Sequence, residues 1–525
     1  MSADEESCPG ASRSRPPRAA TSLLPSRWRN SHPAAVGALG AVLLLLGSAW
    51  YQGMTNPPYR FADEQAHVGY VLSILDSHLP TIDTAIPVDQ GDDALQRRLA
   101  KEVPRRRDVW VANHPPFAYV LAAPFAAITD ALHVPGGPLL TLRLLNLIAA
   151  AVAVALIYRL GSNLCGGDRR AGLLAAGIVA AAPHVGFVVS LGFNDGVGLL
   201  ATTAMLLAVE RLCREGATRS TVIALGLCCA GASAARAMAA GLAVVAGAIG
   251  VGVVARSSNV RRWWALAWLA LPTVLGVGWF YALNLHRYGD LTGSGHLFDK
   301  FARARRGTVF DGIAHVSIWK HAVRTLFTRR MDVALRGDSR LAYELILALI
   351  IFSALAVAVL VAADRPWRAR PRRPSGVERE RSDGLVHRHQ LPALGWTAMA
   401  AIMMVNIVLV AQHWAGGGTP NVRYLMPSMP IVASMVALSV VRLGGRWEGA
   451  ALLLILVNLH RARTAAAVHH LLRTPRGSRG SVLSMPLAPE WLRLGGVTVA
   501  VVGCFLLLGS ELWMCTRRQP TGLRA

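Results

Sequence analysis

An adjacent pair of acids, Asp63 and Glu64, stands at the start of an amphipathic stretch whose apolar residues recur at helical spacing. His67 follows one helical turn later. A carboxylate in such a place can act as a general base or as a ligand for a divalent cation. The simpler alternative is an acid pair that only stabilises the positive end of its helix dipole.

Two further polar groups lie far away in the sequence. Asn194 and Asp195 stand between two apolar runs and precede a glycine, and Asn113 and His114 precede a pair of prolines. Asp195 could share metal binding or general-base work with Asp63, and His114 could meet an anionic group. Each group also has a plainer interpretation, since Asn-Asp-Gly forms tight turns and prolines begin helices.

The later part of the chain adds basic and aromatic residues. His296 lies in a basic stretch, 286–340, and Arg423 with Tyr424 begins a late apolar run. Guanidinium groups and basic loops bind phosphate or diphosphate. The alternatives are an aromatic belt at the membrane surface and an arginine that snorkels to water.

Membrane helices must position these residues. The chain has 525 residues, of which 53% are hydrophobic and 16% are charged, too few charges for a soluble chain of this length. Apolar runs of about 17–25 residues recur, the length that crosses about 30 Å of hydrocarbon, where backbone groups must be satisfied within helices. The fold class is therefore all-α, a polytopic transmembrane helical bundle of about 11–13 spans with juxtamembrane helices in the first external loop. The candidate spans are 34–53, 138–160, 171–193, 195–212, 220–237, 238–255, 263–285, 341–363, 391–413, 424–443, 447–468 and 491–513.

The net charge of +24 comes mostly from arginine. Cytoplasmic loops of membrane proteins retain Lys and Arg, so this charge predicts orientation and contact with membrane lipids, and we expect no nucleic-acid partner. The apolar stretch 115–132 must then stay out of the span count, because otherwise Arg159, Arg169 and Arg170 would lie outside.

The same rule places loops 54–137 and 286–340 outside, so that Asp63, Asp195 and Arg423 share one membrane face. It fits less well near the C-terminus, where 469–490 is basic yet would lie outside. The expected division is a basic cytoplasmic tail over 1–33, a catalytic membrane core over 34–363, a basic cytoplasmic linker over 364–390, membrane helices over 391–513 and a cytoplasmic tail over 514–525.

In their order along the chain, these features resemble the GT-C class of membrane glycosyltransferases. The likeness is to the polyprenyl-phosphate-sugar-dependent superfamily that includes protein O-mannosyltransferases and aminoarabinose transferases. Members have an Asp-Glu pair opening the first external loop, a His-Pro-Pro stretch before the second span and an acid at the end of the third. The Tyr-Gly-Asp stretch at 288–290 and the Arg-Tyr-Leu element at 423–425 are similar as well, and the likeness covers about residues 34–430.

The resemblance implies an inverting glycosyltransferase that moves a hexose or pentose from a polyprenyl-phosphate donor. The acceptor would be an extracytoplasmic glycan of the cell envelope, a lipid or a protein. Asp63 matches the catalytic base, and Glu64 a residue that assists it. The substrate-binding residues would be His67, Asn113, His114, Asn194, Asp195, His296, Arg423 and Tyr424.

The resemblance also implies a location and a cofactor. The protein would be a multi-pass protein of the bacterial plasma membrane, with a cytoplasmic N-terminus and an active site that faces outside. A divalent metal ion is the one cofactor that it admits, with Asp63 and Asp195 as candidate ligands. Some metal-binding relatives have an acid where this chain has Asn113, which argues against a metal.

The alternative function is a membrane transporter or a flippase of a lipid-linked glycan. Arg143 and Arg236 favour it, because both lie within predicted membrane spans, and charged residues there often mark a transport pathway. Transporters hold such residues near the midplane of repeated halves, however, and this sequence has no evident repeat.

Overall fold

The computed structural model describes residues 26–87, 93–101, 107–134, 136–257, 260–327, 339–363, 392–419, 421–445, 447–473 and 487–517. Within them, the secondary structure is helical apart from an isolated bridge between Ala85 and Asp108. The predicted all-α membrane bundle is confirmed. The linker 364–390 and most of both predicted tails lie outside the described residues.

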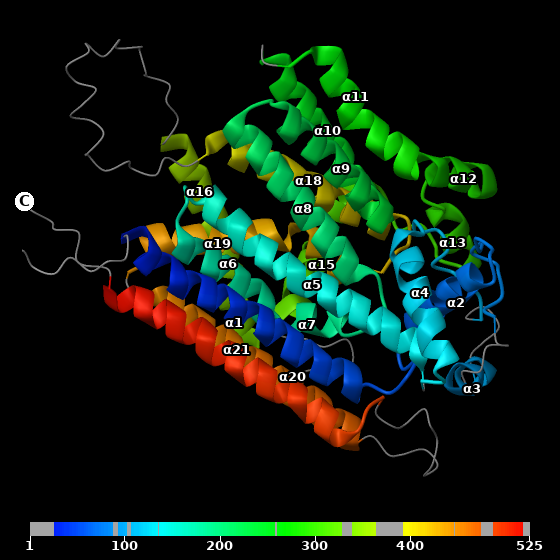
Figure 1. Ribbon diagram of the computed structural model, residues 1–525. Coiled ribbons are helices and arrows are strands. Elements are labelled where there is room, and N and C mark those ends of the chain that lie inside the picture. Colours follow the sequence, from blue (N-terminus) through cyan, green and yellow to red (C-terminus); the bar gives the residue numbers. More distant parts are fainter. Residues whose placement is uncertain are drawn as a thin grey trace, which may run out of the picture.

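Each predicted span corresponds to one helix or to helices in series (Figure 1). These helices are α1 (Ser26–Thr55), α5 (Gly137–Leu164), α6 (Arg169–Ala181) with α7 (Pro183–Val189), α8 (Asp195–Glu215), α9 (Arg219–Ala235), α10 (Ala237–Ala255), α11 (Arg262–Thr273) with the π-helix η2 (Val274–Gly278) and α12 (Trp279–Tyr288), α16 (Ser339–Ala363), α18 (Ala393–Ala415), the 3-10 helix η3 (Val422–Ser428) with α19 (Met429–Leu443), α20 (Glu448–Arg473) and α21 (Glu490–Arg517). Shorter helices fill the two long loops: α2 (Ala62–Leu75), α3 (Asp93–Lys101), α4 (Phe117–Ala131), α13 (Ser294–Lys300), α14 (Val309–Ala314) and α15 (Val316–Phe327).

Length and composition alone identify eight helices in the described residues that could cross a membrane, and up to nine if the bent pair α6–α7 is one span. Helix α9 and the apolar part of α16, Leu347–Val359, fall below the required length. These criteria therefore return fewer spans than the 11–13 expected from the sequence, although every expected span is a helix.

The apolar stretch at 115–132 forms α4, which is too short to cross. Its 15 residues reach about 22 Å at 1.5 Å per residue, against about 30 Å of hydrocarbon. The positions of the two neighbouring spans also show that the chain does not cross between them. Arg143 near the start of α5 donates to the carbonyls of Gly53 and Asn56 at the end of α1. The end of α1 and the start of α5 thus lie at one end of the bundle, which we name the loop end.

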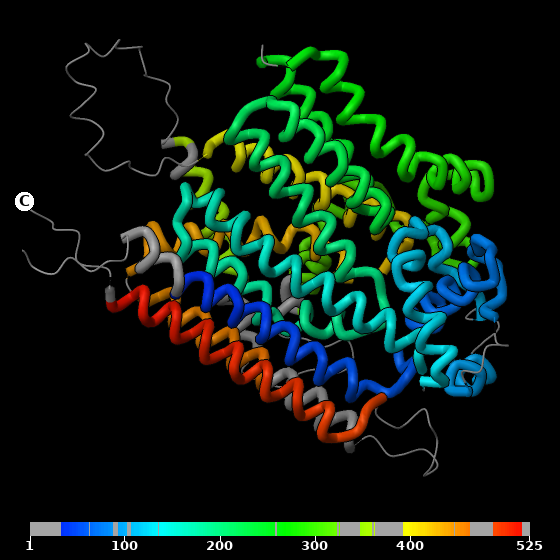
Figure 2. Tube along the Cα trace, in the orientation of Figure 1, coloured from blue at the N-terminus to red at the C-terminus, as the bar shows by residue number. Residues whose placement is uncertain are grey.

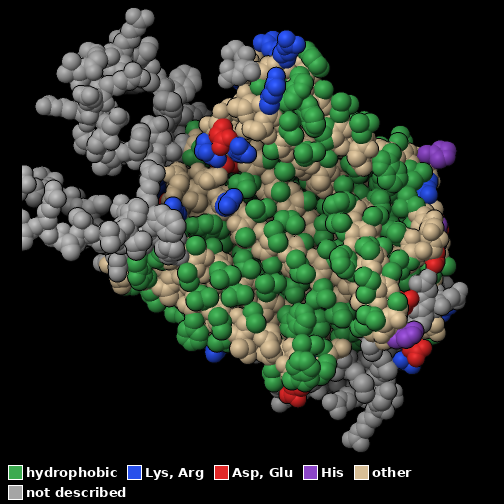
Figure 3. Space-filling view, viewed as in Figure 1, with side chains coloured by type: hydrophobic (Ala, Val, Ile, Leu, Met, Phe, Trp, Pro, Cys, Tyr) green, Lys and Arg blue, Asp and Glu red, His purple; other side chains and the backbone are tan. Residues whose placement is uncertain are grey.

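One face of the molecule is apolar in its middle and charged near its edges. In Figure 3, hydrophobic side chains cover the middle of the visible face, whereas Lys and Arg gather near its upper and left edges. Charged side chains and histidines lie at the right edge, which is the loop end. This distribution fits a multi-pass membrane protein, because charge is costly in hydrocarbon.

Two antiparallel spans close the C-terminal region. Gly449 at the start of α20 lies beside Glu511, and Trp50 at the end of α1 donates to the carbonyl of Leu492 at the start of α21. Helix α20 therefore runs toward the loop end and α21 runs back from it. Most of the predicted external basic stretch 469–490, which fits the charge rule poorly, lies outside the described residues.

The first and last membrane helices pack along their whole length through small residues. Figure 2 shows α1 and α21 side by side, although they are at opposite ends of the chain. A Cβ atom at Gly496 would lie 2.7 Å from Cδ1 of Trp50 and 2.8 Å from the carbonyl oxygen of Gly47. Small residues thus allow the two backbones to approach closely.

We expect Gly496→Val to lower the thermal stability of the detergent-purified protein, because overpacking a tight contact costs about 1–3 kcal/mol. The matched control is Gly495→Val, since a Cβ atom at Gly495 meets nothing within 4 Å. Scanning fluorimetry measures both melting temperatures. Equal shifts in the two variants would show that α1 and α21 do not pack as described.

Candidate active site at the loop end

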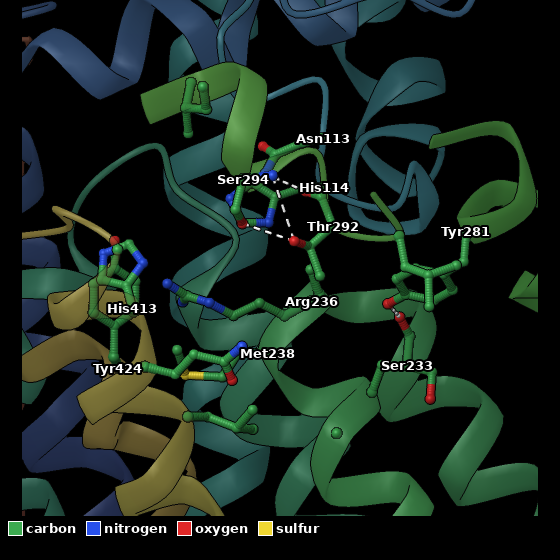
Figure 4. A pocket seen from close by; sticks show the side chains of 18 of the residues that line it. Asn113, His114, Ser233, Arg236, Met238, Tyr281, Thr292, Ser294, His413 and Tyr424 are labelled. Carbon is green, nitrogen blue, oxygen red and sulfur yellow. Dashed lines mark hydrogen bonds between the residues drawn. The ribbon is translucent and has the colours of Figure 1, made fainter. Parts of the chain in front are cut away.

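A cavity of about 1220 Å³ opens at the loop end, between the two long loops and the helices α9, α10, α11 and α18. Five of the predicted site residues line it: Asp63, Asn113, His114, Arg423 and Tyr424. Glu64, His67, Asn194, Asp195 and His296 do not line it. Figure 4 shows that residues from distant parts of the chain, such as His114, Arg236 and His413, converge here.

Asp63 forms an ion pair with Arg423 at 2.9 Å on the cavity wall. The Asp63 side chain is 34% exposed, and its oxygen Oδ2 accepts from the guanidinium. Arg423 is the second residue of η3, where the side chain of Asn421 accepts from its backbone N–H. Its guanidinium also lies over the rings of Phe193 and Tyr424, at 5.3 Å and 5.5 Å.

A second ion pair joins Asp195 to Arg236. Asp195 is the first residue of α8, and Arg236 is the extended residue between α9 and α10. Arg236 lines the cavity and lies 5.6 Å from the centre of the Tyr424 ring, whereas Asp195 lies behind it. The two acid–arginine pairs therefore meet at Tyr424.

Glu64 points away from the cavity into the protein core. Its two oxygens accept from Nε and Nη2 of Arg143, each at 2.9 Å, and Oε1 also accepts from the backbone N–H of Gly192. Both side chains of this pair are at most 1% exposed. Glu64 thus joins α2 to α5 and to the segment before α8.

His67 and His114 form a buried aromatic group behind and beside Asp63. Nδ1 of His67 shares a 2.8 Å hydrogen bond with the hydroxyl of Tyr119, and the two imidazole rings stack 6.4 Å apart. Burial, and then the charges of Arg423 and Arg236, hold the pKa of His67 well below its ordinary value. Burial and Arg236 do the same to the pKa of His114. Both rings are therefore neutral near pH 7.

Asn113 connects the two long loops. Its side chain donates to the carbonyl of Thr292 at 2.8 Å, and its own carbonyl accepts from the side chain of Asn284 at 3.3 Å. Thr292 and Ser294 share a 2.8 Å hydrogen bond on the same wall (Figure 4). Hydroxyl and amide groups of this kind can donate hydrogen bonds to a polar ligand and accept them from it.

Two predicted residues serve other contacts. Asn194 donates to the carbonyl of Ala235 at 3.3 Å and so fastens the end of α9. Nε2 of His296 lies 2.7 Å from Oδ2 of Asp83, and the His296 ring stacks on Tyr288. His296 thus belongs to a contact between the two long loops, outside the cavity lining.

Arg236 and His413 line the cavity but were not predicted as site residues. The sequence marks Arg236 only as an intramembrane arginine that favours a transporter, and it does not single out His413. Each interrupts an apolar pattern at a helix end, which is the signal that could have found them.

The residues present do not fit a bound divalent cation. Asp63 and Asp195, the candidate ligands, each pair with an arginine that would have to move before a cation could bind. In the part of the chain that the structure describes, no three His, Cys, Asp or Glu side chains form a group that could hold a metal. Asn113, where some relatives have an acid, supplies no charge to such a site.

Residues 113–281 match the model of a family described as Dolichyl-phosphate-mannose-protein mannosyltransferase. The matched segment begins at the cavity wall and contains Asp195 and Arg236. The predicted resemblance to GT-C glycosyltransferases that use polyprenyl-phosphate donors is confirmed over this segment. No curated protein sequence matches the chain significantly.

Several solved structures align with most of the chain. The archaeal oligosaccharyltransferase AglB from Archaeoglobus fulgidus, in complex with an inhibitory peptide and a dolichol-phosphate, has a TM-score of 0.39 and 14% identity over 93% of this chain and 56% of its own. The oligosaccharyltransferase of the same organism in complex with Zn and sulfate has a TM-score of 0.40 and 16% identity, over 90% and 61%. ArnT from Cupriavidus metallidurans, bound to undecaprenyl phosphate, has a TM-score of 0.34 and 14% identity, over 88% and 87%. The chain thus spans less than two thirds of the two oligosaccharyltransferases.

We expect Glu64→Gln to destabilise the protein by about 3–5 kcal/mol, because it leaves the charge of Arg143 buried and unpaired. Asp63→Asn is the matched control, since its side chain lies at the cavity wall and should change stability much less. Thermal unfolding in detergent measures both. Equal losses would contradict the different roles given to these adjacent acids.

Acid should destabilise the protein through its buried histidines. Their folded-state pKa is depressed, so the folded state binds fewer protons than the unfolded chain, and stability falls as the pH drops below about 6.5. We expect His114→Asn to reduce the fall in melting temperature between pH 7.5 and pH 5. The exposed His78 provides the control, His78→Asn, which should leave the fall unchanged. An undiminished fall in His114→Asn would refute a neutral His114.

Proposed function

We propose that the protein is an inverting glycosyltransferase that moves a sugar from a polyprenyl-phosphate donor to an extracytoplasmic acceptor. The observation that carries the proposal is the position of Asp63. Its carboxylate stands on the wall of a cavity that is polar and cationic at the loop end and apolar toward the membrane. The family described for residues 113–281, whose named donor is a dolichyl-phosphate sugar, supports the same chemistry.

The apolar part of the cavity fits the lipid chain of the donor. Its walls come from Ala240, Val244 and Gly247 of α10 and from Leu269 and Val274 of α11 and η2. Val244 is 72% exposed and Val274 is 58% exposed, so this groove is open toward the side that faces lipid. A polyprenyl chain could lie here while its phosphate reaches the arginines.

The polar part fits the phosphate and the sugar. Arg423 and Arg236 provide positive charge where negative charge develops on the departing phosphate, which stabilises the transition state. His114, which is neutral, can contribute a hydrogen bond but no charge. Asn113, Thr292 and Ser294 can bind hydroxyl groups of the sugar or the acceptor.

The transfer is a single displacement. The acceptor hydroxyl gives its proton to the carboxylate of Asp63 as its oxygen forms a bond to the anomeric carbon. The bond from that carbon to the phosphate oxygen breaks, and the lipid phosphate leaves with the electron pair. Attack opposite the leaving group inverts the anomeric configuration. Arg423 holds Asp63 in place for this step.

The proposal includes a location and an acceptor class. The distribution of basic residues over the predicted loops supports a cytoplasmic N-terminus and a cavity that opens at the outer face of a bacterial plasma membrane. The acceptor would then be a glycan, lipid or protein of the cell envelope, and the sugar a hexose or pentose.

The arginines that favoured a transporter are held by contacts at the loop end. Arg143 is bonded to Glu64 and to the end of α1, and Arg236 is bonded to Asp195. Transporters, by contrast, place their charged sites near the midplane of the membrane. Transfer is therefore the function that the site supports best.

We expect Asp63→Asn to slow sugar transfer by about 10²–10⁴-fold, because it removes the general base. The assay uses the purified protein in liposomes, a labelled polyprenyl-phosphate sugar and envelope extract as acceptor. Asp299→Asn, an equal charge change on an exposed residue outside the cavity, should transfer at the wild-type rate. Undiminished transfer by Asp63→Asn would overturn the mechanism, and lipid transport without any transfer would favour a flippase.

A further inference from the structure

Arg236 occupies an unusual place for an arginine. It separates α9 from α10 with an extended backbone, φ −159° and ψ 136°, so the chain turns at this residue and its side chain enters the cavity. The residue is only 5% exposed. Figure 4 shows the side chain extending across the pocket toward His413 and Tyr424. A buried charge of this kind requires partners, because burial without them is costly.

One partner is Asp195, which lies behind the arginine as seen from the cavity. Nη1 of Arg236 donates to Oδ1 of Asp195, and the other carboxylate oxygen is buried without a partner in the described structure. Asp195 is the first residue of α8, where the helix dipole also favours its charge. The acid is therefore held in place, and it in turn fixes one edge of the guanidinium.

The rest of the guanidinium remains available. A guanidinium has five N–H donors in a planar fork, and Asp195 takes only those of Nη1. Both guanidinium groups lie over the ring of Tyr424. The guanidinium carbon of Arg423 is 5.5 Å from the ring centre, and that of Arg236 is 5.6 Å from it. Arg423 is paired through Nη1 with Asp63, the proposed base, whereas Asp195 takes no part in the proton transfer, so Arg236 can bind an anion while Asp63 changes its charge.

We propose that Arg236 is the resident cation of the active site, binding the departing phosphate directly, and that transfer requires no divalent metal. The inference rests on the proposed glycosyltransferase function. The guanidinium stands where a metal bound to Asp195 would have to lie, and it supplies a fixed positive charge and two-pronged hydrogen bonding to phosphate oxygens. Asp195 is a positioning residue that acts through Arg236.

A purely structural role is the competing hypothesis, since the pair also joins α8 to the corner between α9 and α10. The two roles differ in what they change. A structural pair affects melting temperature and active fraction, whereas a phosphate ligand affects kcat more than the KM for donor, because charge on the phosphate increases in the transition state.

The test measures transfer in liposomes by wild type, Arg236→Lys and Arg236→Ala, with and without EDTA. Wild type should keep its full rate after EDTA treatment, and added Mg²⁺ or Mn²⁺ should not raise it. Arg236→Ala should lower kcat by about 10²–10³-fold, as removal of one transition-state donor does, with a smaller change in KM. Arg236→Lys should fall between them, because lysine keeps the charge but loses the fork. Arg256→Ala, at the other end of α10, is the control and should match wild type.

Chemical rescue keeps the test independent of folding. Millimolar guanidinium chloride should restore part of the kcat of Arg236→Ala, because the free ion can occupy the vacated place beside Asp195. In the Arg236→Ala background, Asp195→Asn should cause no further loss of kcat but should abolish this rescue.

The outcomes separate the two levels of the proposal. If wild type transfers no sugar at all, the glycosyltransferase function fails. If wild type transfers but loses its activity to EDTA and regains it with Mg²⁺, or if Arg236→Ala keeps the wild-type kcat, the function stands and the role of Arg236 is refuted. Absence of guanidinium rescue in a folded Arg236→Ala variant would also refute it.

Discussion

The buried ion pair between Glu64 and Arg143 is the contact on which the candidate active site at the loop end depends. One guanidinium holds both oxygens of Glu64 on α2 and the carbonyls of Gly53 and Asn56 at the end of α1. The ends of α1, α2 and α5 are thereby held together at the loop end of the bundle. Successive residues of a helix diverge by about 100°, so directing Glu64 into the core directs Asp63 toward the cavity. Glu64 thus orients Asp63, the proposed general base.

Charge balance explains how so many ionisable groups coexist at this site. Asp63 and Asp195 each have an arginine, and both arginines share the ring of Tyr424. The two buried histidines add no charge, because their neutral forms are favoured. With its acids paired, the site has cationic edges and polar N–H groups that suit the phosphate of the proposed donor, and its apolar groove suits the lipid chain of that donor.

The sequence was sufficient for the membrane architecture because two strong physical rules apply to it. Every apolar run predicted as a span forms a helix or helices in series, although length and composition identify only eight or nine candidate spans in the described residues, and α4 is too short to be among them. The sequence also singled out Asp63, His114 and Arg423 as site residues, and all three line one cavity. It could not separate the roles of Asp63 and Glu64, since that depends on which side of α2 meets Arg143. It also missed Arg236 as a cavity residue, because the ion pair of Arg236 with Asp195 forms only when α8 packs beside the corner between α9 and α10.

The central claim is that this cavity holds a polyprenyl phosphate with its head at the arginines and its chain between α10 and α11. The most direct measurement is photo-crosslinking of the purified protein with a polyprenyl phosphate that carries a diazirine in its lipid chain, followed by peptide mass spectrometry. The account predicts label on α10 and η2, around Val244 and Val274, and loss of that label when unlabelled polyprenyl phosphate competes. Label confined to other helices, or label on α10 that competitor does not displace, would contradict it.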